Sequence, residues 1–274
     1  MNKFKGKSKI IDNKYVIKNT NKDLRELYNY LNERNFDMHP YIYDINDKEI
    51  RTEYIEETNN IEYELALADV LSNLHYKTTK LKDVSKRKYK EIYDKLLSNI
   101  SYLTLYYDEF IKKTEPKKYI SPSEYLFERN FSLINYLLSY SKNTLDNWYQ
   151  LVENKEKERV VIVHNNLKKS KVLRSDKNYL IGFDKYLVDT PVIDLYKLYI
   201  NENDLDFKTF ITEYNKNYSL NIEEQKLFLT LISIPKKIEF INNEILNIKN
   251  LKNILDYMYK TKKLIFDFEK EVAE

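Results

Sequence analysis

The chain contains no cysteine and only two glycines, Gly6 and Gly182, in 274 residues. The absence of cysteine excludes disulfide bonds and thiolate metal sites, which fits a cytoplasmic protein without requiring one. Loops that wrap a phosphate generally use glycine, because it permits positive φ and a close approach of the backbone. We therefore expect no glycine-rich phosphate loop in this protein.

Long apolar runs are also missing, and none approaches the roughly 20 residues that a membrane-spanning helix needs. The first seven residues include Lys3, Lys5 and Lys7, but no apolar segment follows them, so the sequence predicts no secretory signal. Neither sign of charge dominates, since 46 Lys and Arg face 43 Asp and Glu, a net charge of +3. This balance predicts no general affinity for polyanions. We expect a soluble, cytoplasmic protein without a membrane anchor.

Short β-prone runs fill the first part of the chain, residues 1–57. Residues 4–18 predict a hairpin, and residues 41–44 and 50–55 predict two further strands. Between them, residues 21–35 carry leucines three and four apart, which is typical of a helix. The expected order of elements is β-β-β-α-β-β, with three strands before the helix and two after it.

The remainder of the chain, residues 58–274, has the spacing of a mainly helical region. Apolar residues at helical spacing predict helices over residues 61–75, 86–113 and 236–262. Residues typical of a capping box mark the start of two more helices: Ser121 with Glu124, and Asn221 with Glu224.

A loop with a distinctive layout follows the apolar strand expected at residues 160–163. It opens with His164, and a hairpin then ends at residues 181–184. This layout resembles that of the aminoglycoside and choline kinase-like phosphotransferases, especially the branch with bacterial spore coat protein S-like members. The residues at matching offsets are His164, Leu167, Ile181, Phe183, Asp184, Pro191, Asp194 and Leu195.

The resemblance implies a protein kinase-like α+β fold with two lobes. A small antiparallel β lobe with one helix would span residues 1–57. A large, mainly helical lobe would span residues 58–274 and carry the catalytic loop region at residues 160–195. In this family, an Asp two residues after the loop His accepts the proton of the substrate hydroxyl. An Asn and a second Asp further on hold magnesium.

Those three positions read Asn166, Lys171 and Gly182 in this chain. An amide cannot accept a proton at neutral pH, an ammonium group repels a divalent cation, and glycine has no side-chain ligand. The sequence therefore predicts a pseudokinase with no catalytic residue, no metal ligand and no required cofactor. His164 and Asp194 are expected to brace the loop through hydrogen bonds.

An active small-molecule kinase that uses ATP and Mg²⁺ on a hydroxyl substrate stays open as the alternative. Asp184 is the one carboxylate that could restore a metal site, since the length of the preceding hairpin can vary. Under this alternative Glu53, Asp176 or Asp189 would take unusual roles.

A vestigial nucleotide cleft is the second predicted site. By the resemblance, Lys18 stands at the nucleotide lysine and Glu26 is placed to pair with it. Glu53 and Ile55 would belong to the hinge between the lobes. The plain alternative for Lys18 and Glu26 is a pair of ordinary surface residues in a lysine-rich protein.

Lys171 has three open roles: an ion pair with Asp184, a contact to a phosphate, or membership of a solvated cluster with Lys168 and Lys169. The same cluster, together with Arg174, is the one feature that suggests nucleic acid, and we do not expect a nucleic-acid partner. A protein partner, or a small molecule in the old substrate cleft, is the expected ligand. If the chain comes from a sporulating bacterium, the resemblance allows a place in the spore coat.

Overall fold

The computed structural model describes residues 3–5, 8–20, 22–46, 48–58 and 60–273; Gly6 lies outside them. The chain divides into two compact units. The first comprises Met1–Lys82 and Glu158–Leu220, and the second comprises Asp83–Lys157 and Asn221–Glu274. The boundary that the sequence predicted between residues 57 and 58 divides two lobes and lies inside the first of these units. The division into lobes at that point stays a prediction.

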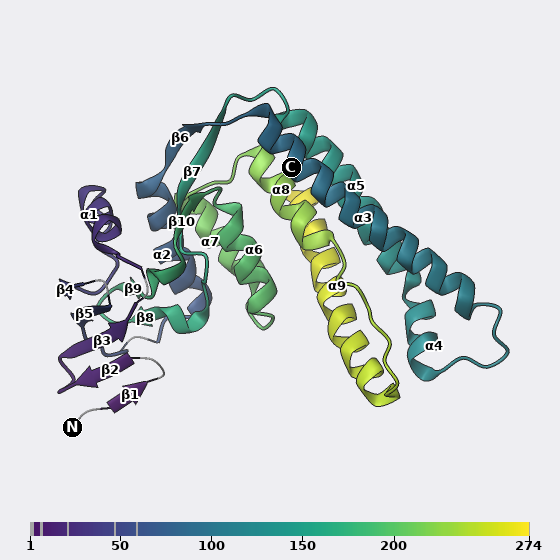
Figure 1. Cartoon of the computed structure of the whole chain (residues 1–274), viewed down its shortest axis with the longest axis horizontal. Coiled ribbons are helices and arrows are strands. Elements are labelled where there is room, and N and C mark those ends of the chain that lie inside the picture. Colours follow the sequence, from purple (N-terminus) through teal and green to yellow (C-terminus); the bar gives the residue numbers. More distant parts are fainter. Residues whose placement is uncertain (1–2, 6–7, 21, 47, 59, 274) are drawn as a thin grey trace. The chain divides into compact units, whose positions relative to one another are not determined.

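The first unit opens with an antiparallel sheet of five strands in the order β1-β2-β3-β5-β4 (Figure 1). The hairpin between β2 and β3 turns at Asp12 and Asn13, which both have positive φ. Hairpin turns favour this conformation because it matches the twist of the strands, and Asp and Asn tolerate it. The strands are β1 (Lys3–Lys5), β2 (Ser8–Ile11), β3 (Tyr15–Asn19), β4 (Ile42–Ile45) and β5 (Glu49–Glu53).

One helix, α1 (Arg25–Glu33), lies between β3 and β4 in the chain and buries Leu27, Tyr28 and Leu31. The spacing of these residues places them on one face, as the sequence predicted. The order β-β-β-α-β-β is confirmed, although β5 ends at Glu53 and leaves Ile55 in the extended segment that follows.

The rest of the first unit is built around α2 (Tyr63–Thr78), which is buried on most of its surface. This helix packs along α7 (Phe207–Asn217) and against the hairpin of β8 (Val172–Arg174) and β9 (Asn178–Leu180). A second sheet has the order β10-β7-β6. The remaining elements are β6 (Lys80–Asp83), β7 (Lys157–Val163), η1 (Lys169–Lys171), η2 (Phe183–Lys185), β10 (Leu187–Asp189) and α6 (Val192–Asn201).

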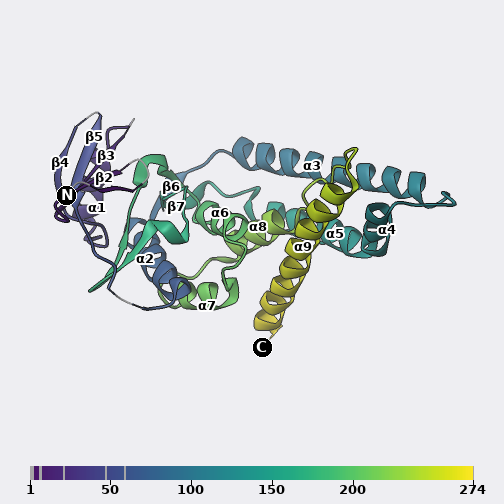
Figure 2. The same cartoon turned by 90° about the horizontal axis from the view of Figure 1, so that it is seen from below.

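The second unit is helical, and α5 packs against α3, α8 and α9. The helix α3 is continuous over its length (Figure 2). Both predicted capping boxes are present, with Glu124 and Glu224 bonded back to the N-cap residues. The helices are α3 (Lys86–Thr114), α4 (Pro122–Arg129), α5 (Phe131–Val152), α8 (Ile222–Ser233) and α9 (Glu244–Ala273).

The helix predicted over residues 236–262 is wrong at its start, because α9 begins at Glu244. The buried Tyr107 explains the difference: its hydroxyl donates to the Lys236 carbonyl (2.6 Å) and accepts from the Ile238 N–H (3.1 Å). These bonds hold the preceding segment outside a helix. The Asn243 side chain then accepts the Leu246 N–H at the start of α9.

Within the described ranges, the helices are too short or too polar to cross a bilayer. Together, the small antiparallel sheet and the larger helical part form the mixed α+β architecture that the sequence predicted.

Candidate functional site

The predicted loop begins where β7 ends, after four buried residues at 160–163. The carboxylate of Asp194, in the first turn of α6, accepts the backbone N–H groups of His164 and Asn165, both at 2.6 Å. Asp194 is completely buried, and one of its oxygens also lies 3.4 Å from His75 Nε2. Because hydrogen bonds from N–H groups to an ionised acceptor are strong, this contact fixes the start of the loop.

Both ring nitrogens of His164 are engaged. Nδ1 accepts the Asn166 N–H (3.3 Å), which leaves the proton on Nε2 to donate to the Ile181 carbonyl (3.0 Å). Burial lowers the pKa of His164, and the ring packs edge-on to Phe183 at 5.2 Å. A neutral imidazole with both nitrogens used is a structural contact, and it has no free nitrogen with which to accept a proton.

Asn165 is a site residue that our sequence reasoning missed. Its φ is 62°, in the left-handed region that asparagine tolerates better than most residues. Its side chain donates to the Lys185 carbonyl (2.8 Å) and accepts from the Lys197 ammonium group. The available signal was an Asn directly after the loop His, since Asn is among the residues that tolerate positive φ.

Lys18 of β3 forms an ion pair with Asp184 of η2. The predicted pair of Lys18 with Glu26 is wrong among the residues described. Glu26 is exposed on α1, whereas the neighbouring Tyr28 is on the buried face. Burial, followed by the Asp184 charge, raises the pKa of Tyr28, and its ring lies 6.0 Å from that of Phe183. Glu26 therefore lies on the exposed face of α1, whereas Tyr28, two positions further on, is the residue of this helix that the Asp184 charge affects.

Lys171 lies against Gly182. The β8–β9 register pairs Val172 with Leu180, and the Ile181 N–H donates to the Lys171 carbonyl (2.9 Å). Gly182 has φ of 86°, and a Cβ atom built on it would lie 2.9 Å from Lys171 Nζ. The hairpin register thus directs the lysine side chain into the space that a side chain at position 182 would occupy.

An ion pair between Lys171 and Asp184 is absent from the described part of the chain, so that hypothesis is wrong. Burial and the nearby Lys18 ammonium lower the pKa of Lys171, and the Asp184 carboxylate opposes them. Asp184 is thus close enough to affect Lys171 electrostatically while its ion pair is with Lys18.

The other carboxylates proposed for an active kinase are engaged locally. Asp176 accepts from the Tyr179 hydroxyl (3.0 Å), Asp189 accepts the Thr190 N–H (2.8 Å), and a Glu53 oxygen lies 3.5 Å from the Tyr41 nitrogen. In the described ranges, no group of three or more His, Cys, Asp or Glu side chains is placed to hold a metal ion.

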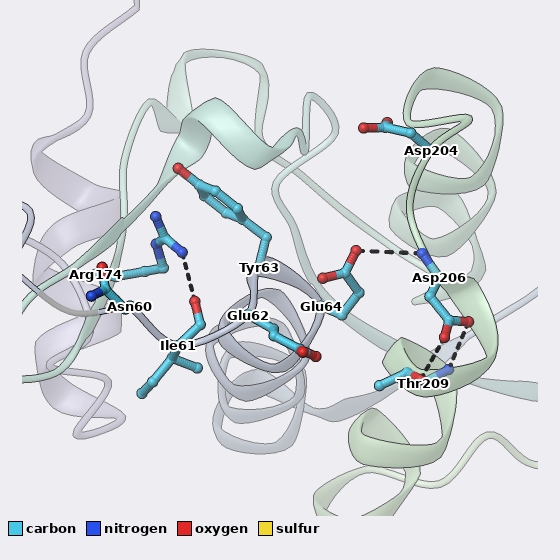
Figure 3. A pocket seen from close by; sticks show the side chains of 9 residues that line it. All are labelled: Asn60, Ile61, Glu62, Tyr63, Glu64, Arg174, Asp204, Asp206 and Thr209. Carbon is cyan, nitrogen blue, oxygen red and sulfur yellow. Dashed lines mark hydrogen bonds between the residues drawn. The ribbon is translucent and has the colours of Figure 1, made fainter.

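A separate pocket of about 480 Å³ lies within the first unit, at the start of α2 (Figure 3). The Arg174 guanidinium lies 3.7 Å from the centre of the Tyr63 ring and donates to the Ile61 carbonyl (2.6 Å). Sequence reasoning missed this pocket because three distant segments form it. Its acidic lining residues are Glu62, Glu64, Asp204 and Asp206.

Neither a family model nor a curated protein matches the chain. Solved structures do match. An aminoglycoside phosphotransferase from Alicyclobacillus acidocaldarius superposes with a TM-score of 0.66 at 11% identity, covering 100% of this chain and 92% of that one. A glucosamine kinase bound to glucosamine, ADP and inorganic phosphate gives a TM-score of 0.57 at 8% identity, covering 97% and 80%.

At these identities the likeness defines the fold alone. The fold is the kinase-like α+β fold of small-molecule phosphotransferases, as the sequence predicted.

Proposed function

We propose that this chain is a degenerate member of the aminoglycoside and choline kinase-like phosphotransferases, a pseudokinase that binds a ligand and transfers no phosphoryl group. The kinase-like fold and the braced loop at His164 support the frame of such an enzyme. The residue types at positions 166, 171 and 182 support the loss of its chemistry.

One observation carries the proposal: the Lys171 ammonium lies against Gly182. The family pattern has an Asn and an Asp at these two positions, and both hold magnesium there. Phosphoryl transfer depends on metal ions that neutralise the charge developing on the phosphates. An ammonium group cannot ligate a metal, and its charge repels one.

Asn166 completes this argument, because it stands at the position of the proton-accepting Asp. Its backbone N–H is bonded to His164, so the turn that presents its side chain is retained. Its amide can orient a hydroxyl group but cannot take its proton.

A turnover assay tests the proposal. We expect no ADP formation above the level without protein when ATP and Mg²⁺ are offered with an aminoglycoside, choline or glucosamine. Turnover by the wild-type protein that Asp184→Asn abolishes would contradict the proposal and establish an active kinase.

That active kinase is the second candidate, because Asp184 pairs with Lys18, which the resemblance assigns to the nucleotide. It would use ATP and Mg²⁺, with Asp184 as a relocated ligand. We favour the pseudokinase, since a single carboxylate that already neutralises one lysine and has a second lysine nearby is a poor site for a divalent ion.

For the biological setting, we propose a cytoplasmic bacterial protein with a protein partner or a small molecule in the cleft. A place in the spore coat follows from the resemblance to the spore coat branch alone. Fractionation of sporulating and growing cells separates the two settings. Recovery of the protein with the spore coat favours the spore coat, and recovery in the cytoplasmic fraction favours the cytoplasm.

A further inference from the structure

Positive charge is concentrated around the degenerate loop. Four lysines, at positions 18, 168, 171 and 185, interact electrostatically with one another or with Asp184. The single carboxylate of Asp184 is committed to Lys18. This local excess contrasts with the near balance of charge over the whole chain.

Lys171 is the unusual member of this group. Its side chain is half-buried, and within the described residues its ammonium group has neither a hydrogen bond nor an ion pair. Lys168 and Lys185 are exposed, so water solvates their charges. Withdrawing an ammonium group from water without a partner is costly, and an anion at this point would remove that cost.

The position of Lys171 is set by the backbone. The β8–β9 register and the bond between Ile181 N–H and Lys171 carbonyl fix its Cα opposite the end of the hairpin. The absence of a side chain at Gly182 provides room for the ammonium group. The backbone of Lys171 is therefore positioned before any ligand binds, which reduces the entropic cost of binding.

We propose that Lys171 and Lys18 together bind an oligophosphate group without a divalent metal ion, with the Lys171 ammonium supplying the positive charge that magnesium supplies in the active enzymes. This inference rests on the proposed function, in which the metal ligands are lost. Lysine binds phosphate as a compact point charge, so the two ammonium groups of Lys171 and Lys18 suit a multiply charged anion.

Magnesium distinguishes this site from a kinase site. In an active kinase the metal bridges the phosphates and the protein, so a chelator weakens binding. Here Mg²⁺ would neutralise the phosphates and meet the Lys171 charge, so binding should be tighter in a chelator than in excess Mg²⁺.

Calorimetric titration of the full chain with ATP and with tripolyphosphate, in EDTA and in excess Mg²⁺, tests the proposal. We expect binding of both probes in EDTA, weakened severalfold by Mg²⁺. Lys171→Met should weaken binding in EDTA about tenfold or more, since it removes a charged hydrogen-bond donor.

Lys168→Met is the matched control, because it removes the same charge from an exposed lysine of the same loop. We expect it to change the affinity less than about threefold, as screened surface charges do. Thermal unfolding of both variants verifies that they are folded.

Three results would overturn the inference: no binding of either probe in EDTA, binding that requires Mg²⁺, or equal losses in the two variants. None of these three results contradicts the proposed function, which only turnover of ATP would contradict. Absence of both binding and turnover removes the oligophosphate site and leaves the pseudokinase proposal intact.

Discussion

At the scale of single residues, Asp194 holds the loop that begins at His164 in shape whichever side chains stand at the three altered positions of that loop region. Its two oxygens accept the N–H groups of His164 and Asn165, and the imidazole of His164 continues the brace to Ile181. These contacts involve none of positions 166, 171 and 182. Side chains at those positions can therefore change without loss of the turn.

The brace yields a prediction about stability. Asp194→Asn replaces one accepting oxygen by an NH₂ group that faces a buried N–H, so that one donor is left unpaired. We expect a loss of about 2–3 kcal/mol in the free energy of unfolding, measured by urea denaturation. Asp184→Asn is the control, because a partly exposed ion pair contributes only about 0–1 kcal/mol. Equal effects of the two substitutions would contradict the bracing role.

Single-residue reasoning from sequence succeeded where the partner is the backbone and failed where it is another side chain. His164 and Asp194 bond to main-chain groups whose positions follow from the loop itself. The partner of Lys18 depends on which way a helix and a hairpin turn their side chains. The sequence predicted Glu26, and the structure has Asp184.

At the scale of elements, the register of β8 and β9 decides the chemistry of the site. It places Lys171 beside Gly182, which lies 11 residues further along the chain. Strand register of short hairpins is hard to predict, because three residues on each strand carry little hydrophobic pattern. The resemblance assigned both residues to the former metal site, but the sequence did not predict that the Lys171 side chain would fill the space at Gly182.

Helix ends follow the same logic. Capping boxes at α4 and α8 were predictable because their signals are local. The start of α9 was not predictable, because the hydroxyl of Tyr107, far away in the chain, bonds the backbone at Lys236 and Ile238.

Tyr107→Phe tests this account of the α9 boundary. It removes the hydroxyl and leaves a buried carbonyl and N–H without that partner, so we expect a loss of about 1–3 kcal/mol in the free energy of unfolding. Tyr119→Phe is the comparison, since Tyr119 is 83% exposed. Should Tyr107→Phe be as stable as Tyr119→Phe, the extended segment must be held by other contacts.

At the scale of the whole molecule, the fold was predictable from the order of elements and the loop motif, and structural similarity supports it at 11% identity. The acidic pocket beside α2 was not, because Glu62, Arg174 and Asp204 come from three separate segments. The central claim is that a kinase-like fold is combined with residues at positions 166, 171 and 182 that can neither accept a proton nor bind a metal ion.

Binding of Mn²⁺, followed by the electron paramagnetic resonance signal of the free ion, tests that claim most directly. In the presence of ADP we predict that adding the protein lowers the free Mn²⁺ signal no further than the nucleotide alone does. A protein-dependent fall in that signal, abolished by Asp184→Asn, would contradict the account.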